Sequence, residues 1–306
     1  MMDIVIEVKN LYKSYGDVEA VKGISFSVSK GEIFGMLGPN GAGKTTTMEI
    51  VEGIRNANSG EVEVLGMNIR QHQRQVKANI GVQLQATSLY PRLSVREVLD
   101  LFGSFFPRHV SPDKLIEMVG LEDSRSKRCI NLSGGQQQRL SVALAMVNNP
   151  SILFLDEPSS GLDPQSRHNI WEVIEYIRSE GKSVFITTHY MEEAERLCDR
   201  LAIIDHGEII ATDRPETLIT QHFKEEAIEF ELDQHIDEEV FAQVAGVTNA
   251  QVENGKMTIY SSEVPITISA LMELVKQRNI QLTNLYVRRA TLEDVFLKLT
   301  GRKIRE

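Results

Sequence analysis

The chain has 306 residues, about twice the ~150 residues typical of one domain, so two folding units are expected. Hydrophobic residues make up 42% of the chain and charged residues 25%, which excludes a disordered or collagen-like chain. The 33 Lys and Arg against 43 Asp and Glu give a net charge of −10, which disfavours a surface that tracks nucleic-acid phosphates.

No apolar run approaches the length of a membrane-spanning helix, which needs roughly 18 residues. The longest run without glycine is 142–147. The first residues alternate like a strand and lack the basic start and apolar stretch of a secretory signal. Cys129 and Cys198 show neither a zinc spacing nor a disulfide framework. We therefore expect a cytoplasmic protein with inert, buried thiols.

The first 52 residues predict a sheet followed by a strand–loop–helix unit. A glycine-rich loop covers 38–44, and the helix after it covers 45–52 and stops at Gly53. The strands predicted before the loop span 4–8, 24–28 and 32–37.

The middle of the chain predicts a mostly helical insertion and then a parallel sheet. Helical periodicity dominates 88–128, where Ser94 and Glu97 have the spacing of a capping box. Two short apolar strands follow, at 152–155 and 183–186, with a helix between them. This is a βαβ unit whose strands are buried on both faces.

A domain boundary is predicted near residue 220, after a hairpin over 201–211 and a short helix opened by Pro215. Beyond it the pattern restarts as a small α+β module without a chemical motif. The strands expected there span 227–231, 247–252, 256–260 and 281–288, and the helices span 237–244, 266–277 and 291–299.

The glycine-rich loop fits the pattern G-x-x-x-x-G-K-[ST] and lies between a predicted strand and a predicted helix. Glycines let backbone N–H groups turn toward phosphate oxygens, Lys44 reaches the β- and γ-phosphates, and the Thr45 hydroxyl ligates Mg²⁺. The alternative is a glycine-rich turn without a ligand. The residues predicted to cradle the phosphates are Gly38, Pro39, Asn40, Gly41, Ala42, Gly43, Lys44, Thr45 and Thr46.

Two carboxylates, Asp156 and Glu157, end the apolar strand at 152–155. Ligands of α/β sheets bind at this end of the strands. Asp156 is the candidate for holding Mg²⁺, directly or through water. Since consecutive strand side chains alternate, Glu157 is expected to point elsewhere and to polarise the attacking water.

A second anion site is predicted where glycines and a serine hydroxyl open a helix. This segment consists of Leu132, Ser133, Gly134, Gly135 and Gln136. Two copies arranged head to tail could therefore enclose a nucleotide between unlike surfaces. A plain helix cap is the alternative.

Together with Ser160-Gly161-Leu162-Asp163 and His189, these motifs resemble the ordered motif set of an ATP-binding cassette (ABC) nucleotide-binding domain over residues 1–220. The resemblance implies a P-loop NTPase-type α/β fold: a mainly parallel core, an N-terminal antiparallel sheet and a helical subdomain at about 88–135. It leaves 221–306 as a C-terminal α+β accessory domain.

The same resemblance assigns roles to single residues. It implies that Tyr15 stacks on adenine and that Gln85 senses Mg²⁺ and water, with Gln83 as a competing assignment. His189 would contact the γ-phosphate, and Asp163 would communicate between subunits. Ser133 and Gly135 would meet the partner's γ-phosphate. Plainer readings of Tyr15, Gln85 and His189 are a strand aromatic, a surface amide and a strand cap.

The segment from Ala290 to Arg302 resembles the tail of ATPase subunits in the drug, antibiotic and polysaccharide exporter branch, and it also forms an amphipathic helix. We therefore expect an ATPase with ATP and Mg²⁺ that energises a membrane exporter. Its partners would be an integral membrane permease, contacted around 88–106, and a second nucleotide-binding subunit. The alternatives are an importer ATPase with a regulatory C-terminal domain and a soluble ABC ATPase acting on nucleic acid or ribosomes.

Overall fold

The computed structural model describes residues 3–84, 89–223, 225–232, 237–253 and 256–301. The chain divides into two compact units, the first ending at Pro215 and the second starting at Glu216. Within the described residues, no helix combines the length and the apolar character that crossing a bilayer requires. Both cysteines are buried, as expected from the sequence.

The first unit contains an antiparallel sheet near its N-terminus. Its strand order is β2-β1-β4-β5, and Val62 and Val64 of β4 are buried while Glu61 and Glu63 point outward. The strands are β1 (Ile4–Tyr15), β2 (Val18–Ser29), β4 (Ser59–Val64) and β5 (Met67–Asn68). The first two strands are longer than predicted, and β4 and β5 were not predicted at all.

The second sheet of this unit has the order β10-β9-β3-β8-β7-β6, and only β10 runs antiparallel to its neighbour. Every residue of β3, β7 and β8 is buried, as a sheet covered on both faces requires. The predicted fold class is thereby confirmed. The strands are β3 (Ile33–Leu37), β6 (Ile80–Gln83), β7 (Ile152–Asp156), β8 (Ser183–Thr188), β9 (Arg200–Asp205) and β10 (Glu208–Asp213).

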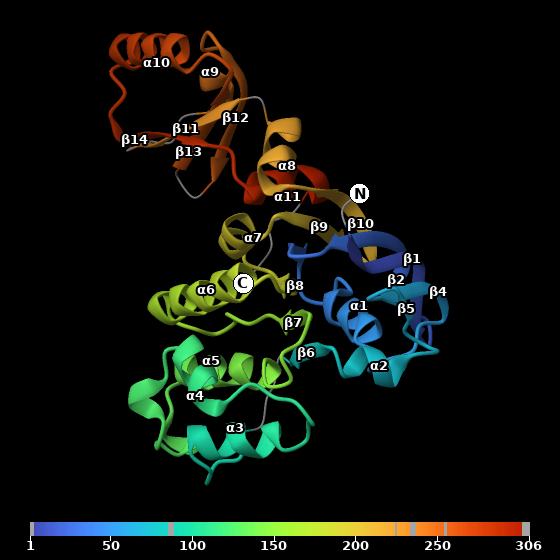
Figure 1. Ribbon diagram of the computed structural model, residues 1–306. Coiled ribbons are helices and arrows are strands. Elements are labelled where there is room, and N and C mark those ends of the chain that lie inside the picture. Colours follow the sequence, from blue (N-terminus) through green and yellow to red (C-terminus); the bar gives the residue numbers. More distant parts are fainter. Residues whose placement is uncertain (1–2, 85–88, 224, 233–236, 254–255, 302–306) are drawn as a thin grey trace. The chain divides into compact units, whose positions relative to one another are not determined.

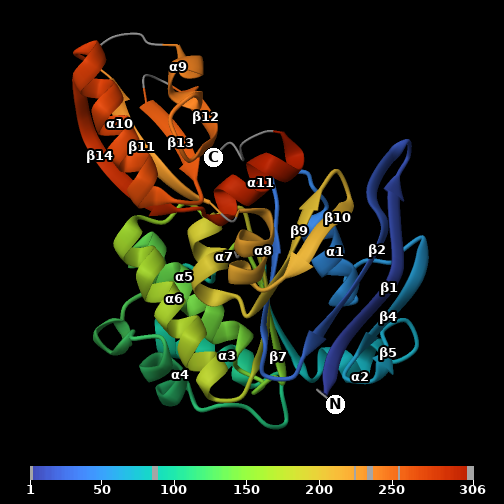
Figure 2. The same cartoon turned by 90° about the horizontal axis from the view of Figure 1, so that it is seen from above.

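Helix α1 (Lys44–Val51) lies between the two sheets (Figures 1 and 2). Beside it, Phe26 of β2 stacks on Phe34 of β3 with ring centroids 5.4 Å apart, and Phe185 of β8 packs against both. The other face of the parallel sheet is covered by α5 (Gly134–Ala145), α6 (Pro164–Ser179) and α7 (Met191–Leu197). The phosphate-loop helix is therefore held from two sides.

The insertion is helical, as predicted. It contains α3 (Val95–Gly103), α4 (Pro112–Met118) and two short 3₁₀ turns, η1 (Glu122–Ser124) and η2 (Cys129–Asn131), before α5 begins. Ser94 and Glu97 form the expected capping box. A short helix that was not predicted, α2 (Gln73–Lys77), precedes β6.

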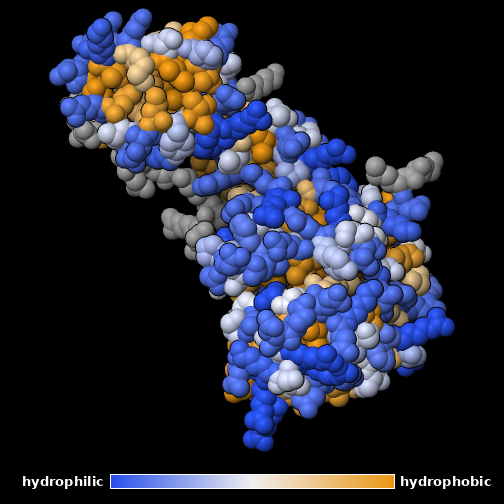
Figure 3. All heavy atoms as spheres, turned by 60° about the vertical axis from the view of Figure 1, so that its left-hand side comes forward, coloured by the Kyte–Doolittle hydropathy of each residue, from blue (hydrophilic) through white to orange (hydrophobic). Residues whose placement is uncertain are grey.

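The second unit has one four-stranded antiparallel sheet of order β12-β13-β11-β14. Its core gathers Ile228, Phe230, Phe241, Ile259 and Leu271 on one face of the sheet. On the surface seen in Figure 3, apolar side chains gather over this unit. The strands are β11 (Glu226–Leu232), β12 (Val247–Glu253), β13 (Lys256–Ser261) and β14 (Leu282–Arg289); the helices are α8 (Pro215–His222), α9 (Glu238–Ala242), α10 (Val264–Arg278) and α11 (Leu292–Thr300).

Candidate active site

The loop between β3 and α1 needs glycine at several positions. Gly41 and Gly43 have φ angles of 81° and 105°, in the left-handed region that residues with a Cβ avoid. A Cβ at Gly43 would lie 2.5 Å from the carbonyl oxygen of Ala20, and one at Gly38 would lie 2.2 Å from that of Ile204. The backbone of the loop therefore packs directly against the backbone at Ala20 and Ile204, with no room for a side chain at Gly38 or Gly43.

The start of α1 is open to an anion. No side chain caps it, so its first N–H groups are left for a ligand, and the helix dipole adds partial positive charge there. A hollow of about 400 Å³ adjoins this point. It is lined by Ala20, Asn40, Gly41, Gly43, Lys44, Thr45, Thr46 and Glu157.

Lys44 joins the loop to the end of β7. Its Nζ donates to the carbonyl oxygens of Gly38 (2.8 Å) and Pro39 (3.2 Å) and lies 3.0 Å from Oε1 of Glu157. Nδ1 of His189 lies 3.2 Å from the other carboxylate oxygen, Oε2. Burial alone would raise the pKa of Glu157, but His189 and the charge of Lys44 outweigh it and hold the pKa at about 2. Glu157 is thus ionised at neutral pH.

Thr45 and Asp156 form the second contact between loop and strand. The Thr45 hydroxyl lies 3.2 and 3.1 Å from the two carboxylate oxygens of Asp156, and Thr187 of β8 donates to Oδ1. Burial raises the pKa of Asp156, and the hydrogen bonds from Thr187 and Thr45 oppose that rise. A hydroxyl and a carboxylate side by side are the hard oxygen donors that suit Mg²⁺.

No group of three or more His, Cys, Asp or Glu side chains that could hold a metal occurs in the described part of the chain. The Thr45 hydroxyl and the Asp156 carboxylate are two oxygen donors that fit Mg²⁺. Mg²⁺ is commonly bound through one or two protein groups, with water and substrate phosphates as the other ligands.

Glu157 has other partners than Asp156, as expected, but strand alternation is not the reason. The residue lies just after β7 with φ 47°, in the left-handed region, so strand alternation does not set its direction. Its backbone N–H donates to the carbonyl and hydroxyl oxygens of Thr187, both at 3.1 Å. The turn brings Asp156 and Glu157 to the same loop, each opposite a different loop residue. Strained backbone of this kind costs on the order of 1–3 kcal/mol and often marks a functional site.

The other predicted nucleotide residues are only partly described. Tyr15 ends β1 and is 40% exposed. Gln85 lies outside the described residues. Gln83 ends β6 and is buried; its Nε2 donates to the Leu84 carbonyl, and its Oε1 has no hydrogen-bond partner among the described residues.

Ser133 caps α5 as predicted, in a capping box with Gln136: its Oγ accepts from the Gln136 N–H at 3.3 Å. It does not line the hollow beside the loop. A Cβ at Gly135 would lie 2.5 Å from the hydroxyl of Ser166, which in turn donates to Asp163 at 2.7 Å. The predicted Ser133 segment and Asp163 are therefore packed together within one copy, a contact made by Ser166.

Thr187 and Ser166 were not predicted as parts of the site. Thr187 binds both the Asp156 side chain and the Glu157 backbone. The available signal was a pair of hydroxyl residues, 187 and 188, ending an otherwise apolar strand just before His189.

Comparison with known proteins decides the family. The sequence model of the family described as "ABC transporter" matches residues 21–160, and one described as "AAA domain, putative AbiEii toxin, Type IV TA system" matches 130–193. Nod factor export ATP-binding protein I of Ralstonia nicotianae is 37% identical over 309 residues, which cover 99% of this chain and 95% of that relative. The chain belongs to the ATP-binding subunits of ABC transporters.

The ABC subunit has further relatives along its whole length. It is 38% identical over 312 residues to the protein of the same name from Paraburkholderia xenovorans, covering 100% of both chains. Among solved structures, cbiO1 from Clostridium perfringens, part of the ABC transporter complex cbiONQ, has a TM-score of 0.64 and 27% identity, covering 72% of this chain and 92% of that one.

A dimeric ATP-binding cassette in a post-hydrolysis state, bound to ADP and Pi, gives a TM-score of 0.62 at 26% identity over 68% of this chain and 98% of that one. The ABC subunit described here is accordingly a nucleotide-binding ATPase with a P-loop NTPase fold. The loop, Asp156 and Glu157 lie within the part matched by the family model.

Proposed function

We propose that this ABC subunit is the ATPase of a membrane exporter and that the site around Lys44 hydrolyses the nucleotide. The observation that supports it most is that two neighbouring residues at the start of α1 reach the two carboxylates that end β7. Lys44 meets Glu157, which also contacts His189, and Thr45 meets Asp156. Full-length relatives named as export ATP-binding proteins favour export over import.

In the proposed reaction, a water oxygen attacks the γ-phosphorus while the bond to the bridging oxygen breaks, and ADP leaves with that electron pair. Glu157 accepts the proton of the attacking water. In the structure described here Lys44 pairs with Glu157; a γ-phosphate competes for the same ammonium group, which would release the carboxylate for the water. His189, 3.2 Å from Glu157, would then contact the γ-phosphate.

Thr45 and Asp156 would hold Mg²⁺, with Gln85 as a third predicted contact. When bound, Mg²⁺ supplies neutralisation of charge on the β- and γ-phosphates. The protein itself holds the Thr45 hydroxyl beside the Asp156 carboxylate, and the hydrogen bond from Thr187 fixes that carboxylate in place.

A second copy or a relative of this chain would complete the site. Ser133 does not line the hollow beside its own loop, yet its hydroxyl and the glycines after it lie at the start of α5, where the helix dipole favours a phosphate. Head-to-tail pairing would place the Leu132–Gln136 segment of one subunit on the nucleotide of the other. Asp163, packed near Gly135 through Ser166, would pass the state of one site to the next.

An integral membrane permease would carry the transport path and hold this subunit at the inner face of the cell membrane. The segment after Gln85, up to about Phe106, is the proposed contact, since it adjoins the predicted nucleotide sensor. In that insertion Arg96 is already paired, with Asp100 and Asp113.

The proposal is tested by purifying the native chain from detergent-solubilised membranes and assaying the complex for Mg·ATP hydrolysis. We expect a copurifying protein with several membrane-spanning helices that raises ATP turnover. Copurification with nucleic acid or ribosomes instead would support the soluble ABC ATPase. Failure of the pure chain to bind Mg·ATP would reject every reading of this site.

A further inference from the structure

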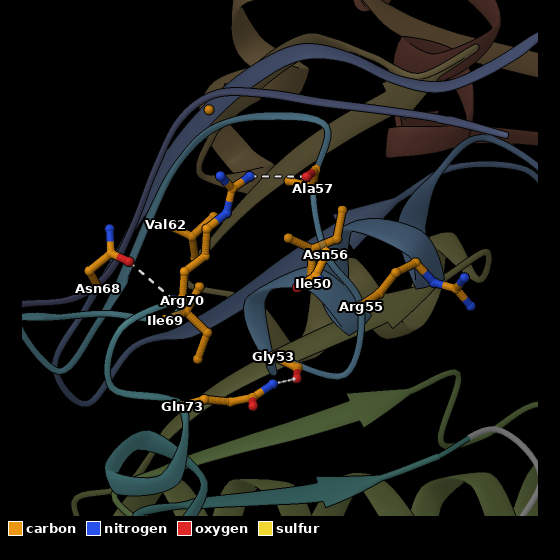
Figure 4. A pocket seen from close by; sticks show the side chains of 11 residues that line it. Ile50, Gly53, Arg55, Asn56, Ala57, Val62, Asn68, Ile69, Arg70 and Gln73 are labelled. Atoms are coloured by element: carbon orange, nitrogen blue, oxygen red, sulfur yellow. Dashed lines mark hydrogen bonds between the residues drawn. The ribbon is translucent and has the colours of Figure 1, made fainter.

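A hollow of about 400 Å³ lies where α1 ends, bordered by β4 and the turn before α2 (Figure 4). Two arginines line it, and they behave differently. Arg70 reaches across toward the chain at Ala57, and its Nη2 donates to the Ala57 carbonyl at 3.0 Å. The guanidinium of Arg55 turns away from the hollow (Figure 4). The guanidinium of Arg55 therefore makes its contacts outside the hollow.

That contact is with Tyr15. The Nε of Arg55 donates to Oε2 of Glu49 at 2.5 Å, and its Cζ lies 5.2 Å from the centroid of the Tyr15 ring, within the ~6 Å of a cation–π contact. Lys13 approaches the same ring, with Nζ 5.1 Å from the centroid. Among the described residues Arg55, but not Lys13, is anchored by an ion pair, and its anchor Glu49 belongs to the phosphate-loop helix.

The Tyr15 hairpin also reaches the phosphate loop. Tyr15 pairs with Val18 across the β1–β2 turn, and Ala20, two residues further along β2, lines the hollow beside Lys44. The carbonyl of Ala20 is the group that excludes a side chain at Gly43. Tyr15 is thus connected to the phosphate loop through β2, and to the end of α1 through Arg55 and Glu49.

An exposed tyrosine at a hairpin end has several rotamers, and stacking a base on it requires one of them. A charged group fixed over the ring reduces that freedom before the ligand arrives, which lowers the entropy cost of binding. We propose that Arg55 is a positioning residue for the nucleotide base: clamped by Glu49, it holds the Tyr15 ring in the orientation on which a purine stacks. This inference rests on the proposed ATP site and on the stacking of adenine on Tyr15 that the family resemblance implies.

The test compares two ligands, Mg·ATP and Mg·tripolyphosphate, which lacks base and ribose. In Arg55→Ala, ATP affinity should fall about 2- to 5-fold, the range of one exposed cation–π contact, while tripolyphosphate affinity stays unchanged. Arg55→Lys should recover part of the loss because it keeps the charge, and Glu49→Gln should show part of it. Arg70→Ala, from the same hollow, is the matched control and should alter neither affinity.

A double-mutant cycle with Tyr15→Ala locates the effect: in that background, Arg55→Ala should add no further loss of ATP affinity. Unchanged ATP affinity in Arg55→Ala, equal losses for both ligands, or a loss that persists without Tyr15 would each overturn the inference. If Tyr15→Ala itself binds ATP normally, the base lies elsewhere and the inference falls with that placement. Tripolyphosphate binding then still reports separately on the phosphate loop.

Discussion

Lys44 Nζ lies 3.0 Å from Oε1 of Glu157, and both side chains are buried. The Lys44 ammonium group of the phosphate loop and the carboxylate of Glu157, the proposed general base, thus form an ion pair in this structure. Burial works to raise the pKa of Glu157, yet the contacts with His189 and Lys44 hold it at about 2, where a carboxylate is a weak base. A ligand that draws Lys44 away would remove one of these contacts and make Glu157 more basic, as its proposed role requires.

Replacing Glu157 tests its assignment as general base. Glu157→Gln should keep Mg·ATP affinity, accumulate a closed dimer, and lose turnover by roughly 10²-fold or more, the scale of general-base catalysis. Phosphate release and size-exclusion chromatography with ATP measure both effects. Glu192→Gln, an exposed acid at the start of α7, is the control and should turn over normally. Normal hydrolysis by Glu157→Gln would remove Glu157 from this role.

Ser133 also caps α5, so a variant that tests its role in ATP hydrolysis has to keep the helix cap. Ser133→Asp keeps a good cap but sets a negative charge where the partner's γ-phosphate is proposed to lie. It should unfold like the wild type and lose ATPase activity at least 10-fold, by like-charge repulsion. Ser133→Asn, which caps without charge, is the comparison. Full activity of Ser133→Asp in the assembled complex contradicts completion of the site by Ser133.

Glu52 should make stability depend on pH. The residue is 1% exposed, and neither carboxylate oxygen has a hydrogen-bond partner among the described residues. Burial, reinforced by Asp156 and Glu49, raises its pKa from 4.5 to about 8. Below pH 4.5 both the folded and the unfolded states hold the proton. Between 4.5 and 8 only the folded state does, so stability is lost as pH rises.

The expected loss across that window is on the order of 4 kcal/mol, since one pKa unit corresponds to about 1.4 kcal/mol. Urea unfolding at pH 5.5 and pH 8 should show a smaller difference for Glu52→Gln than for the wild type. Glu172→Gln, an exposed acid on α6, should follow the wild type. Parallel pH curves for Glu52→Gln and the wild type would show that Glu52 is ionised at both values.

The second unit depends on Arg288. Its guanidinium donates to Glu229 and to Asp294, both carboxylates being nearly buried, and holds the start of α11 to the sheet. Arg288→Met leaves two buried carboxylates short of a partner and should destabilise this unit by about 3 kcal/mol. Adding Asp294→Asn should restore part of the loss by removing one unpaired charge.

Scanning calorimetry of the whole chain measures the Arg288 effect. We expect one transition to shift while the purified chain keeps its basal ATP hydrolysis, because the candidate active site is built within the first unit. A variant with an unchanged melting profile would mean that the ion pairs do not support the unit.

The features that the sequence predicted are the local ones. The phosphate loop, the Ser133 cap and the buried strands at 152–155 and 183–186 each depend on a few adjacent residues, so a short pattern is sufficient. The strand β6 was missed because it is short and contains Gly81. That glycine is needed for packing: a Cβ there would lie 1.9 Å from the Ala145 carbonyl oxygen.

Relations between distant residues were not predictable. Strand alternation does not apply to Glu157, because the residue follows β7 with a left-handed backbone and its N–H is bound by Thr187, 30 residues away. The ion pair between Glu49 and Arg55 forms only because the chain turns after the end of α1, and no helical spacing predicts it. Nothing in the sequence marks Glu52, the residue directly after α1, as the 1% exposed side chain that it is in the structure.

Helix α1 has eight residues, about 12 Å of rigid rod, with Lys44 at its start and the anchor of Arg55 near its end. If phosphates bind at one end and the base is oriented from the other, the span of an acceptable ligand is fixed by a single stiff element. The distance from the base to the β-phosphate is the same in ATP and ADP, so a helix of fixed length cannot distinguish the two nucleotides. Discrimination must then arise at the γ-phosphate, where Lys44, Glu157 and His189 meet.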